Sequence, residues 1–252
     1  MLAHPIVENL RKLRLNGFAE ALEMQIKNPA SKELMFEERL AILVDHEISL
    51  RENRNLQIRL KKAKFKDRAS VPDLIYSPER KIDRSLVLSL ENCDWIKDCK
   101  NVLITGATGT GKSYLAEALA HAACLKGFSV LRVQIPRLLH ELIAAKADGS
   151  YLSLQAKLAK VELLLIDDFG IAPFSDEDRR SFLEIADERY NRKSIILTSQ
   201  LPTDDWHQVI GDSTVGDAIL DRLVHNAHRI CLGGDSMRKK LFLTKGTQNE
   251  RT

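Results

Sequence analysis

The residues Gly106-Ala107-Thr108-Gly109-Thr110-Gly111-Lys112-Ser113 form one uninterrupted motif near the middle of the chain. Their spacing is G-x-x-x-x-G-K-[ST], the pattern of a phosphate-binding loop. Glycines let such a loop curl so that backbone N–H groups point at phosphate oxygens, while Lys112 adds positive charge and Ser113 offers a hydroxyl to Mg²⁺. The next helix directs its positive dipole end at the same phosphates. The motif, extended to Tyr114, therefore predicts an ATP site with Mg²⁺ as cofactor.

The flanks of this loop have the right character. Residues 101–105 are a short apolar run typical of a buried strand, and residues 113–126 have helical spacing before Gly127. A glycine-rich turn that matches by chance would lack this order of strand, loop and helix. Further apolar runs alternate with helical stretches, which predicts an α/β fold with helices on both faces of a parallel sheet. The candidate strands are residues 101–105, 128–133, 162–167, 194–198 and 228–232.

Two carboxylates follow the strand at 162–167. Leu163-Leu164-Leu165-Ile166-Asp167-Asp168 is an aliphatic strand that ends in Asp167 and Asp168. After a complete phosphate loop, this pattern predicts that Asp167 holds Mg²⁺ and that Asp168 orients the attacking water. An ordinary turn at the end of a strand is the alternative. The polar pair Ser199-Gln200 follows the strand at 194–198. One of these side chains can approach the γ-phosphate; alternatively, the pair is only a solvated end of the strand.

The N-terminal region has a different pattern. Apolar residues recur every three or four positions up to about residue 68, which predicts helices, and the second helix is expected to run through a basic segment until Ser70-Val71-Pro72. The basic residues are Arg51, Arg54, Arg59, Lys61, Lys62, Lys64, Lys66 and Arg68. From charge alone, this segment is either a DNA-backbone contact or a solvated helix, and neither is favoured. The expected organisation is a helical domain at 1–69, a connector at 70–85, an ATPase domain at 86–245 and a polar tail at 246–252.

Composition excludes several classes of protein. The net charge of +3 indicates no extreme imbalance over the whole chain. The four cysteines, Cys93, Cys99, Cys124 and Cys231, include no C-x-x-C pair, so reduced thiols are expected and neither a disulfide framework nor a zinc site is indicated. The N-terminus has no apolar secretory core, and no apolar stretch is long enough to span a membrane. A cytoplasmic protein is expected.

Taken together, the motifs resemble those of AAA+ ATPases, and within them the IstB group, the helper ATPases of bacterial insertion sequences, which are related to DnaC helicase loaders. The segments that carry the resemblance are 106–113, 163–170, 195–200, 217–223 and 236–238, together with Leu10, Leu13, Leu15, Gly17, Ala21, Leu22 and Gln25. The resemblance implies a three-layer core with a small helical N-terminal domain. It also implies an ATP-dependent homo-oligomer, a ring or spiral on duplex DNA in the bacterial cytoplasm, that presents target DNA to a transposase and stimulates it.

The resemblance further implies residue roles. Gln200, or Ser199 beside it, takes the place of the sensor-1 residue. Arg222 takes that of the arginine finger that enters a neighbouring subunit's site, unless it only pairs with Asp221 or Asp217. Arg238 resembles the sensor-2 arginine, with a solvated basic end as the alternative. The basic segment becomes the expected DNA contact.

One residue departs from the family pattern. Most AAA+ ATPases have Asp-Glu where this chain has Asp167-Asp168. Aspartate is shorter by one methylene, and the geometry of a general base is sensitive to such a change. Slow hydrolysis is therefore expected. The alternatives are a DnaC-type helicase loader and a nucleotide-gated DNA-binding scaffold with negligible turnover; a small-molecule kinase is disfavoured because it has no use for a basic helical N-terminus.

Overall fold

The computed structural model describes residues 5–237, except for the side chain of Lys32. The chain divides between Ile58 and Arg59 into two compact units. This division falls inside a helix and not at residue 69, where the sequence suggested the end of the N-terminal domain. The functional boundaries at residues 69 and 85 stay predictions, and those at 245 and 246–252 lie outside the described residues.

The first unit is helical, as its apolar spacing predicts. It contains α1 (Pro5–Lys12), α2 (Asn16–Lys27), the 3-10 helix η1 (Pro29–Glu33) and the first part of α3 (Phe36–Ala63). Helix α2 packs closely on α3 at Gly17, where a Cβ would lie only 2.8 Å from the Cα of Glu47. Glu47 also accepts the Phe18 N–H at 3.0 Å and so satisfies a donor in the first turn of α2.

Helix α3 ends earlier than the sequence indicated. The prediction of a helix that continues to Ser70 is wrong, because α3 ends at Ala63 and Lys64 has a φ of 58°. Glycine is the usual residue in this left-handed conformation after a helix, so Lys64 gave no signal of it. Lys66 and Arg68 consequently lie beyond the helix, in the second unit.

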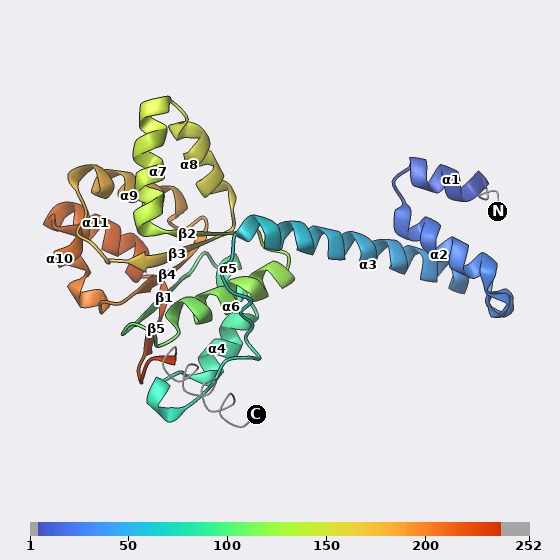
Figure 1. Ribbon diagram of the computed structural model, residues 1–252, viewed down its shortest axis with the longest axis horizontal. Coiled ribbons are helices and arrows are strands. Elements are labelled where there is room, and N and C mark those ends of the chain that lie inside the picture. The colour runs from blue at the N-terminus through green and yellow to red at the C-terminus, as the bar shows by residue number, and fades with distance from the viewer. Residues whose placement is uncertain (1–4, 238–252) are drawn as a thin grey trace, which may run out of the picture. The chain divides into compact units, whose positions relative to one another are not determined.

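The second unit is built on a five-stranded parallel sheet (Figure 1). Its strands lie in the order β2-β3-β4-β1-β5. The predicted α/β class is confirmed, and the five apolar runs correspond to β1 (Asn101–Gly106), β2 (Val130–Gln134), β3 (Leu163–Phe169), β4 (Ser194–Ser199) and β5 (Ala227–Leu232).

Helices cover both faces of this sheet and make three layers (Figure 1). One layer contains α7 (Ile135–Asp148), α8 (Tyr151–Lys160), α9 (Asp176–Arg189), α10 (Trp206–Ile210) and α11 (Ser213–Val224), with η3 (Thr203–Asp205) before α10. The other contains α4 (Arg84–Glu91), α5 (Asp94–Lys97) and α6 (Lys112–Leu125), with η2 (Pro78–Arg80) before α4. Alternate residues of β3 face the two helical layers. Leu164 and Ile166 belong to the hydrophobic core cluster that also contains Phe182 of α9 and Trp206 of α10, whereas Leu165 does not.

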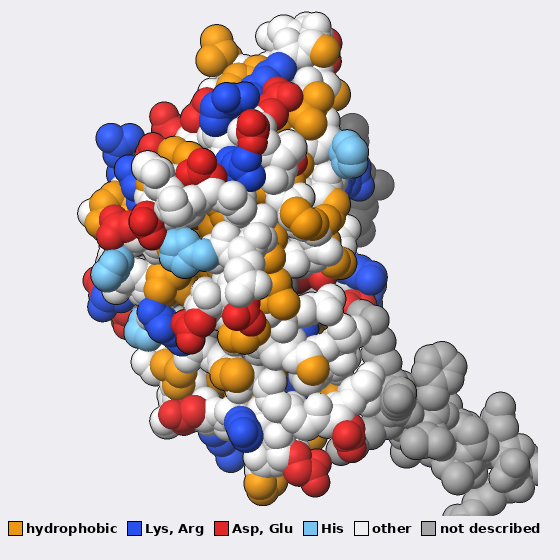
Figure 2. Space-filling model, turned by 90° about the vertical axis from the view of Figure 1, so that its left-hand side faces the viewer, with side chains coloured by type: hydrophobic (Ala, Val, Ile, Leu, Met, Phe, Trp, Pro, Cys, Tyr) orange, Lys and Arg blue, Asp and Glu red, His pale blue; other side chains and the backbone are white. Residues whose placement is uncertain are grey.

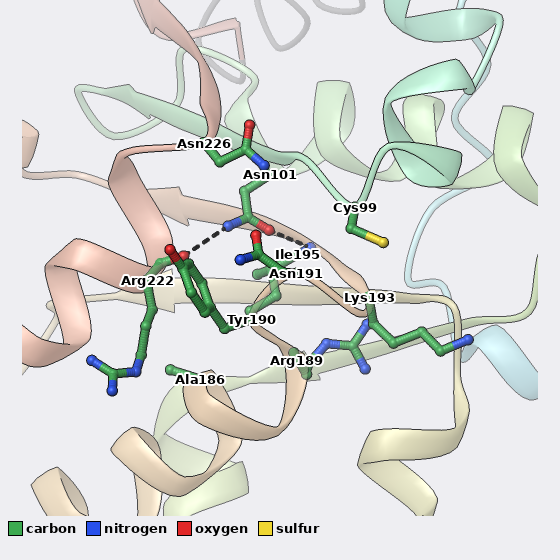
Figure 3. A pocket seen from close by; sticks show the side chains of 10 residues that line it. All are labelled: Cys99, Asn101, Ala186, Arg189, Tyr190, Asn191, Lys193, Ile195, Arg222 and Asn226. Carbon is green, nitrogen blue, oxygen red and sulfur yellow. Dashed lines mark hydrogen bonds between the residues drawn. The ribbon is translucent and has the colours of Figure 1, made fainter.

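The amino ends of the central strands are held by two polar side chains (Figure 3). Arg189 is 1% exposed and donates to the carbonyls of Leu158 and Ser194, each at 2.7 Å, among four such bonds. Burial lowers the pKa of its guanidinium to about 10. Asn101 accepts the Ile195 N–H at 2.9 Å and donates to the carbonyl of Arg222 at 3.3 Å. Within residues 5–237, no helix has both the length and the apolar character that crossing a membrane requires.

Candidate nucleotide-binding site

A cavity of about 790 Å³ lies at the carboxyl ends of the strands, around the loop between β1 and α6. Residues from several separate parts of the second unit line it, among them Arg68, Arg80, Lys112, Ser113, Asp168 and Gln200. A ligand site at the carboxyl ends of parallel strands is the rule for open α/β sheets. The cavity is large enough for a nucleotide.

The phosphate loop has the backbone that its glycines allow. Gly106 has a φ of 146°, and a Cβ there would lie 2.3 Å from the carbonyl oxygen of Leu232 on the neighbouring strand. Gly111 has a φ of 93° and precedes α6, so the N–H groups of the first turn of that helix face the loop. The Lys112 ammonium donates to the carbonyl of Ala107 at 2.9 Å, across the loop where phosphates are expected.

The connector belongs to this site, which sequence reasoning did not recognise. Arg80 is buried and donates to the carbonyls of Ile75 at 2.6 Å and Thr110 at 2.9 Å, and so joins the connector to the phosphate loop. Arg68, expected to contact DNA, also lines the cavity. An arginine buried among carbonyls is not visible as such in a single sequence.

Asp167 is the centre of the polar network. It is 2% exposed; its Oδ1 accepts the hydroxyl of Ser113 at 2.8 Å and that of Thr198 at 2.5 Å, and its Oδ2 accepts Arg132 Nη2 at 2.6 Å. A hydroxyl and a carboxylate beside a phosphate loop are a donor set that suits Mg²⁺, which usually keeps waters and is completed by substrate phosphates. Ser113 and Asp167 are thus brought together as the sequence predicted, whereas Thr198 and Arg132 were not anticipated.

Asp168 points into the cavity because the backbone of β3 is irregular there. Pairing between β3 and β4 shifts register between Ile166 and Phe169, and Asp168 has a φ of 64°. Aspartate tolerates this left-handed conformation better than most residues, and such bulges redirect side chains near functional sites. Its carboxylate accepts Gln134 Nε2 at 3.1 Å. Gln134, the last residue of β2, was missed, although a polar residue ending an apolar strand was the available signal.

The structure separates the two sensor-1 candidates. Gln200 lines the cavity, and its Oε1 accepts the Thr108 hydroxyl of the phosphate loop at 2.7 Å. Ser199 is fully buried and donates to the carbonyl of Phe169 at 2.8 Å. Gln200 is therefore the residue at the end of β4 that is placed to contact a nucleotide.

A second pair of buried charges lies behind Asp167. Arg132 Nε is 2.7 Å from Glu117 Oε1 on α6, and Glu117 is 1% exposed. Glu117 also accepts the backbone N–H groups of Lys66, at 3.2 Å, and Asp67, at 2.8 Å. Burial raises the pKa of the Glu117 carboxyl, against these N–H groups and Arg132, which favour its ionised form.

Arg222 lies away from the cavity. Its carbonyl accepts from Asn101 at the amino end of β1, while its side chain points away from Asn101 (Figure 3). The guanidinium pairs with Asp187 of α9. The two aspartates considered as alternative partners, Asp221 and Asp217, instead lie beside His225 and His207. Arg238 lies outside the described residues.

Arg222 instead lines a separate hollow of about 600 Å³ beside α10 and α11. Acidic, basic and histidine side chains are intermingled on this face of the molecule (Figure 2). The hollow itself contains both signs, with Asp217 and Asp221 next to Arg222 and Arg229. A surface of mixed charge suits a protein partner better than a polyanion.

The side chains of the basic segment are not all free to contact DNA. Arg51, in the first unit, is exposed and pairs with Glu47 at 2.6 Å, and Arg54 is exposed as well. Arg59, in the second unit, is half-buried and donates to the carbonyl of Cys124 at 3.0 Å, so part of its capacity is used structurally. The other five are exposed: Lys61, Lys62, Lys64, Lys66 and Arg68, the last of which also lines the nucleotide cavity.

Comparison with known proteins agrees with this geometry. Residues 8–244 match the model of a family described as "IstB-like ATP binding protein". The chain belongs to the IstB-like family. It is 46% identical over 239 residues to the putative insertion sequence ATP-binding protein y4pL of Sinorhizobium fredii, covering 95% of this chain and 98% of the relative. It is 30% identical over 249 residues to the insertion sequence IS21 putative ATP-binding protein of Pseudomonas aeruginosa, covering 99% and 94%.

Solved structures share the fold of this IstB-like chain. AMPPCP-bound DnaA from Aquifex aeolicus superimposes with a TM-score of 0.59 at 19% identity, over 73% of this chain and 56% of that one. The DnaC helicase loader gives a TM-score of 0.53 at 18% identity, over 62% and 93%. The chain is thus an ATP-binding protein with an AAA+ fold, as predicted.

Proposed function

We propose that this IstB-like protein is an ATP-dependent helper of transposition, acting in the bacterial cytoplasm. ATP binding drives assembly of an oligomer on duplex DNA, the oligomer presents that DNA to a transposase and stimulates it, and hydrolysis dissolves the assembly. The observation that carries the proposal is the separation of Arg222 from the cavity containing Lys112 and Asp168. The cavity already contains Arg68 and Arg80, so the group that its own subunit does not bring to it is Arg222, which a neighbouring copy would supply. The insertion-sequence names of the relatives support transposition as the process.

The cavity residues divide the chemistry of hydrolysis. Lys112 and the loop N–H groups bind the β- and γ-phosphates, and Ser113 and Asp167 hold the metal. Asp168 orients the attacking water, Gln200 contacts the γ-phosphate, and Arg222 of a neighbour approaches the same group; Arg238 is the further candidate. Mg²⁺ neutralises phosphate charge when bound. Because Asp168 is short and already hydrogen-bonded to Gln134, hydrolysis is slow, and the ATP-bound state persists.

The exposed lysines at the end of α3 and after it are the proposed DNA contact in the second unit, namely Lys61, Lys62, Lys64 and Lys66. Arg51 and Arg54 of the first unit are further candidates. Ammonium groups on a surface neutralise phosphates without reading bases, so this contact supplies affinity and not sequence preference.

Replacing Lys112 tests whether ATP controls DNA assembly. Lys112→Ala removes a charge-assisted contact to phosphate, so ATP affinity is expected to fall by about 10- to 100-fold. Electron microscopy with duplex DNA and ATP should then show assemblies for the wild-type protein and for Lys157→Ala, an exposed lysine of α8, but none for Lys112→Ala. Monomers on DNA regardless of ATP would overturn the proposal.

A salt titration tests the DNA surface. The triple substitution of Lys61, Lys62 and Lys64 by Ala is expected to weaken duplex binding and to flatten the slope of log affinity against log salt by up to about 0.9 for each lost phosphate contact. The matched control replaces three other exposed lysines, Lys97, Lys157 and Lys160. An unchanged slope in the first variant would place the DNA contact elsewhere.

A scaffold that binds ATP and hardly hydrolyses it is the second candidate function. The left-handed backbone at Asp168 and its bond to Gln134 favour it, because both restrict the movement of the carboxylate toward a water. Single-turnover hydrolysis with and without DNA separates the two: a rate that DNA does not raise above background supports the scaffold.

A further inference from the structure

A continuous chain of buried and part-buried polar contacts joins Asp167, the proposed metal ligand, to the segment that follows α3. It runs from Asp167 to Arg132, from Arg132 to Glu117, and from Glu117 to the N–H groups of Lys66 and Asp67. Glu117 is 1% exposed and Asp167 is 2% exposed. Buried charges interact with little screening by solvent. A change of charge at Asp167 therefore alters the strength of the contacts farther along this chain.

Arg132 is bonded unequally to its two carboxylates. Its Nη2 donates a hydrogen bond to Asp167 Oδ2 at 2.6 Å. Its Nε lies 2.7 Å from Glu117 Oε1, but the buried Nε–H is not aligned with any acceptor. The guanidinium therefore favours Asp167 in this state and has an unformed hydrogen bond toward Glu117.

A divalent cation at Ser113 and Asp167 changes this balance. It places positive charge beside Arg132 and takes up part of the charge of Asp167, so the attraction of Arg132 to Asp167 weakens. Rotation of the guanidinium aligns the Nε–H with Glu117 Oε1, which is already 2.7 Å away, and forms a full hydrogen bond. Arg132 then competes for the Glu117 carboxylate with the N–H groups of Lys66 and Asp67, which donate to the same oxygens.

The Lys66 N–H is the weakest of these contacts. It is shared between the two Glu117 oxygens at 3.3 and 3.2 Å, whereas the Asp67 N–H makes one bond at 2.8 Å. Stronger pairing of Glu117 with Arg132 therefore loosens residues 64–68 first at Lys66. This segment begins at the left-handed Lys64 and carries basic side chains on both sides of the contact.

We propose that Glu117 and Arg132 are positioning residues that couple metal occupancy at Asp167 to the mobility of residues 64–68. The inference rests on the proposed function, because it needs Mg²⁺ and ATP in the cavity. Binding of Mg·ATP reorients Arg132 so that its Nε–H bonds to Glu117, and releases the backbone at Lys66, so that the lysines of this segment adjust to a DNA backbone.

Hydrogen exchange of individual backbone amides in the full chain tests the coupling. Addition of Mg²⁺ to the protein saturated with AMPPCP should raise the exchange of the Lys66 and Asp67 amides severalfold. In Glu117→Gln the charge is lost and one of the two acceptor oxygens becomes an NH₂ donor, so the attraction to Arg132 weakens and the Mg²⁺-dependent rise should disappear. Arg132→Lys retains a positive charge between both carboxylates but replaces the planar guanidinium by a single ammonium. It should therefore reduce the Mg²⁺-dependent rise in amide exchange.

Binding of AMPPCP and Mg²⁺ is measured on the same samples. Normal binding with unchanged Lys66 and Asp67 exchange in the wild-type protein would overturn the coupling alone. So would a rise of the same size in a folded Glu117→Gln variant, or in Arg132→Lys if Glu117→Gln does not fold. A wild-type protein that does not bind the nucleotide would instead overturn the proposed function and, with it, this inference.

Discussion

Arg222→Ala is expected to lower the rate of ATP hydrolysis by about 10³- to 10⁵-fold, the range for an arginine finger, with little effect on ATP affinity. The reason is geometric: Arg222 is tied to the amino end of β1, while the nucleotide cavity lies at the carboxyl ends of the strands. We therefore expect a neighbouring subunit, and not its own, to use it. Hydrolysis is measured at saturating ATP and DNA, with the exposed Arg192→Ala as the control for loss of charge.

Mixing two inactive variants makes this prediction specific. Lys112→Ala retains Arg222 but has a defective phosphate loop, and Arg222→Ala has an intact loop without the finger. Lys112→Ala does not assemble by itself, but it can still offer its Arg222 to the ATP-filled cavity of an Arg222→Ala subunit. A mixture on DNA is therefore expected to recover part of the wild-type rate at the interfaces that combine the intact loop of one subunit with the arginine of the other. No recovery in mixtures that still co-assemble would show that Arg222 acts within its own chain or only pairs with Asp187.

Asp168→Asn is expected to lower single-turnover hydrolysis by about 10²- to 10⁴-fold, the usual contribution of a general base. Asn has the same shape and keeps a polar group toward Gln134, so ATP and Mg²⁺ affinity should stay close to the wild-type values. Rapid-quench measurement with radiolabelled ATP checks the rate, and nucleotide titration checks the affinity. The exposed Asp98→Asn serves as the control for net charge.

The outcome also separates the two candidate functions. A large loss in Asp168→Asn means that Asp168 acts on water despite its short side chain and left-handed backbone. An equal rate in the wild-type protein and Asp168→Asn, both near background, would leave an ATP-binding scaffold as the function.

Much of this architecture is readable from the sequence because its signals are local. The five strands are continuous apolar runs, which a parallel sheet buried on both faces requires. The phosphate loop is specified by glycines at fixed spacing, and Asp167 by its place after an aliphatic strand. Each of these signals is contained within about ten residues and needs no knowledge of distant partners.

The features that were missed depend on long-range contacts or on unusual backbone. Arg132 and Glu117 look like an ordinary strand and helix residue until the fold places them beside Asp167. Asp187 is far from Arg222 in sequence, so no local pattern indicates their pairing. Lys64 ends α3 in a conformation that lysine rarely adopts, and the helix was therefore predicted too long.

The positions of Arg222 and the nucleotide cavity at opposite ends of the strands restrict the symmetry of any assembly. A contact that joins one end of a subunit to the other end of the next is heterologous, and it leaves a free donor surface and a free acceptor surface after each addition. Such an assembly has a polarity, and if it does not close, its terminal subunit has a cavity that no neighbour's Arg222 reaches. The hydrolysis rate per subunit then rises with the length of the assembly. A bound ATP therefore lasts longer, on average, in a short array on DNA than in a long one.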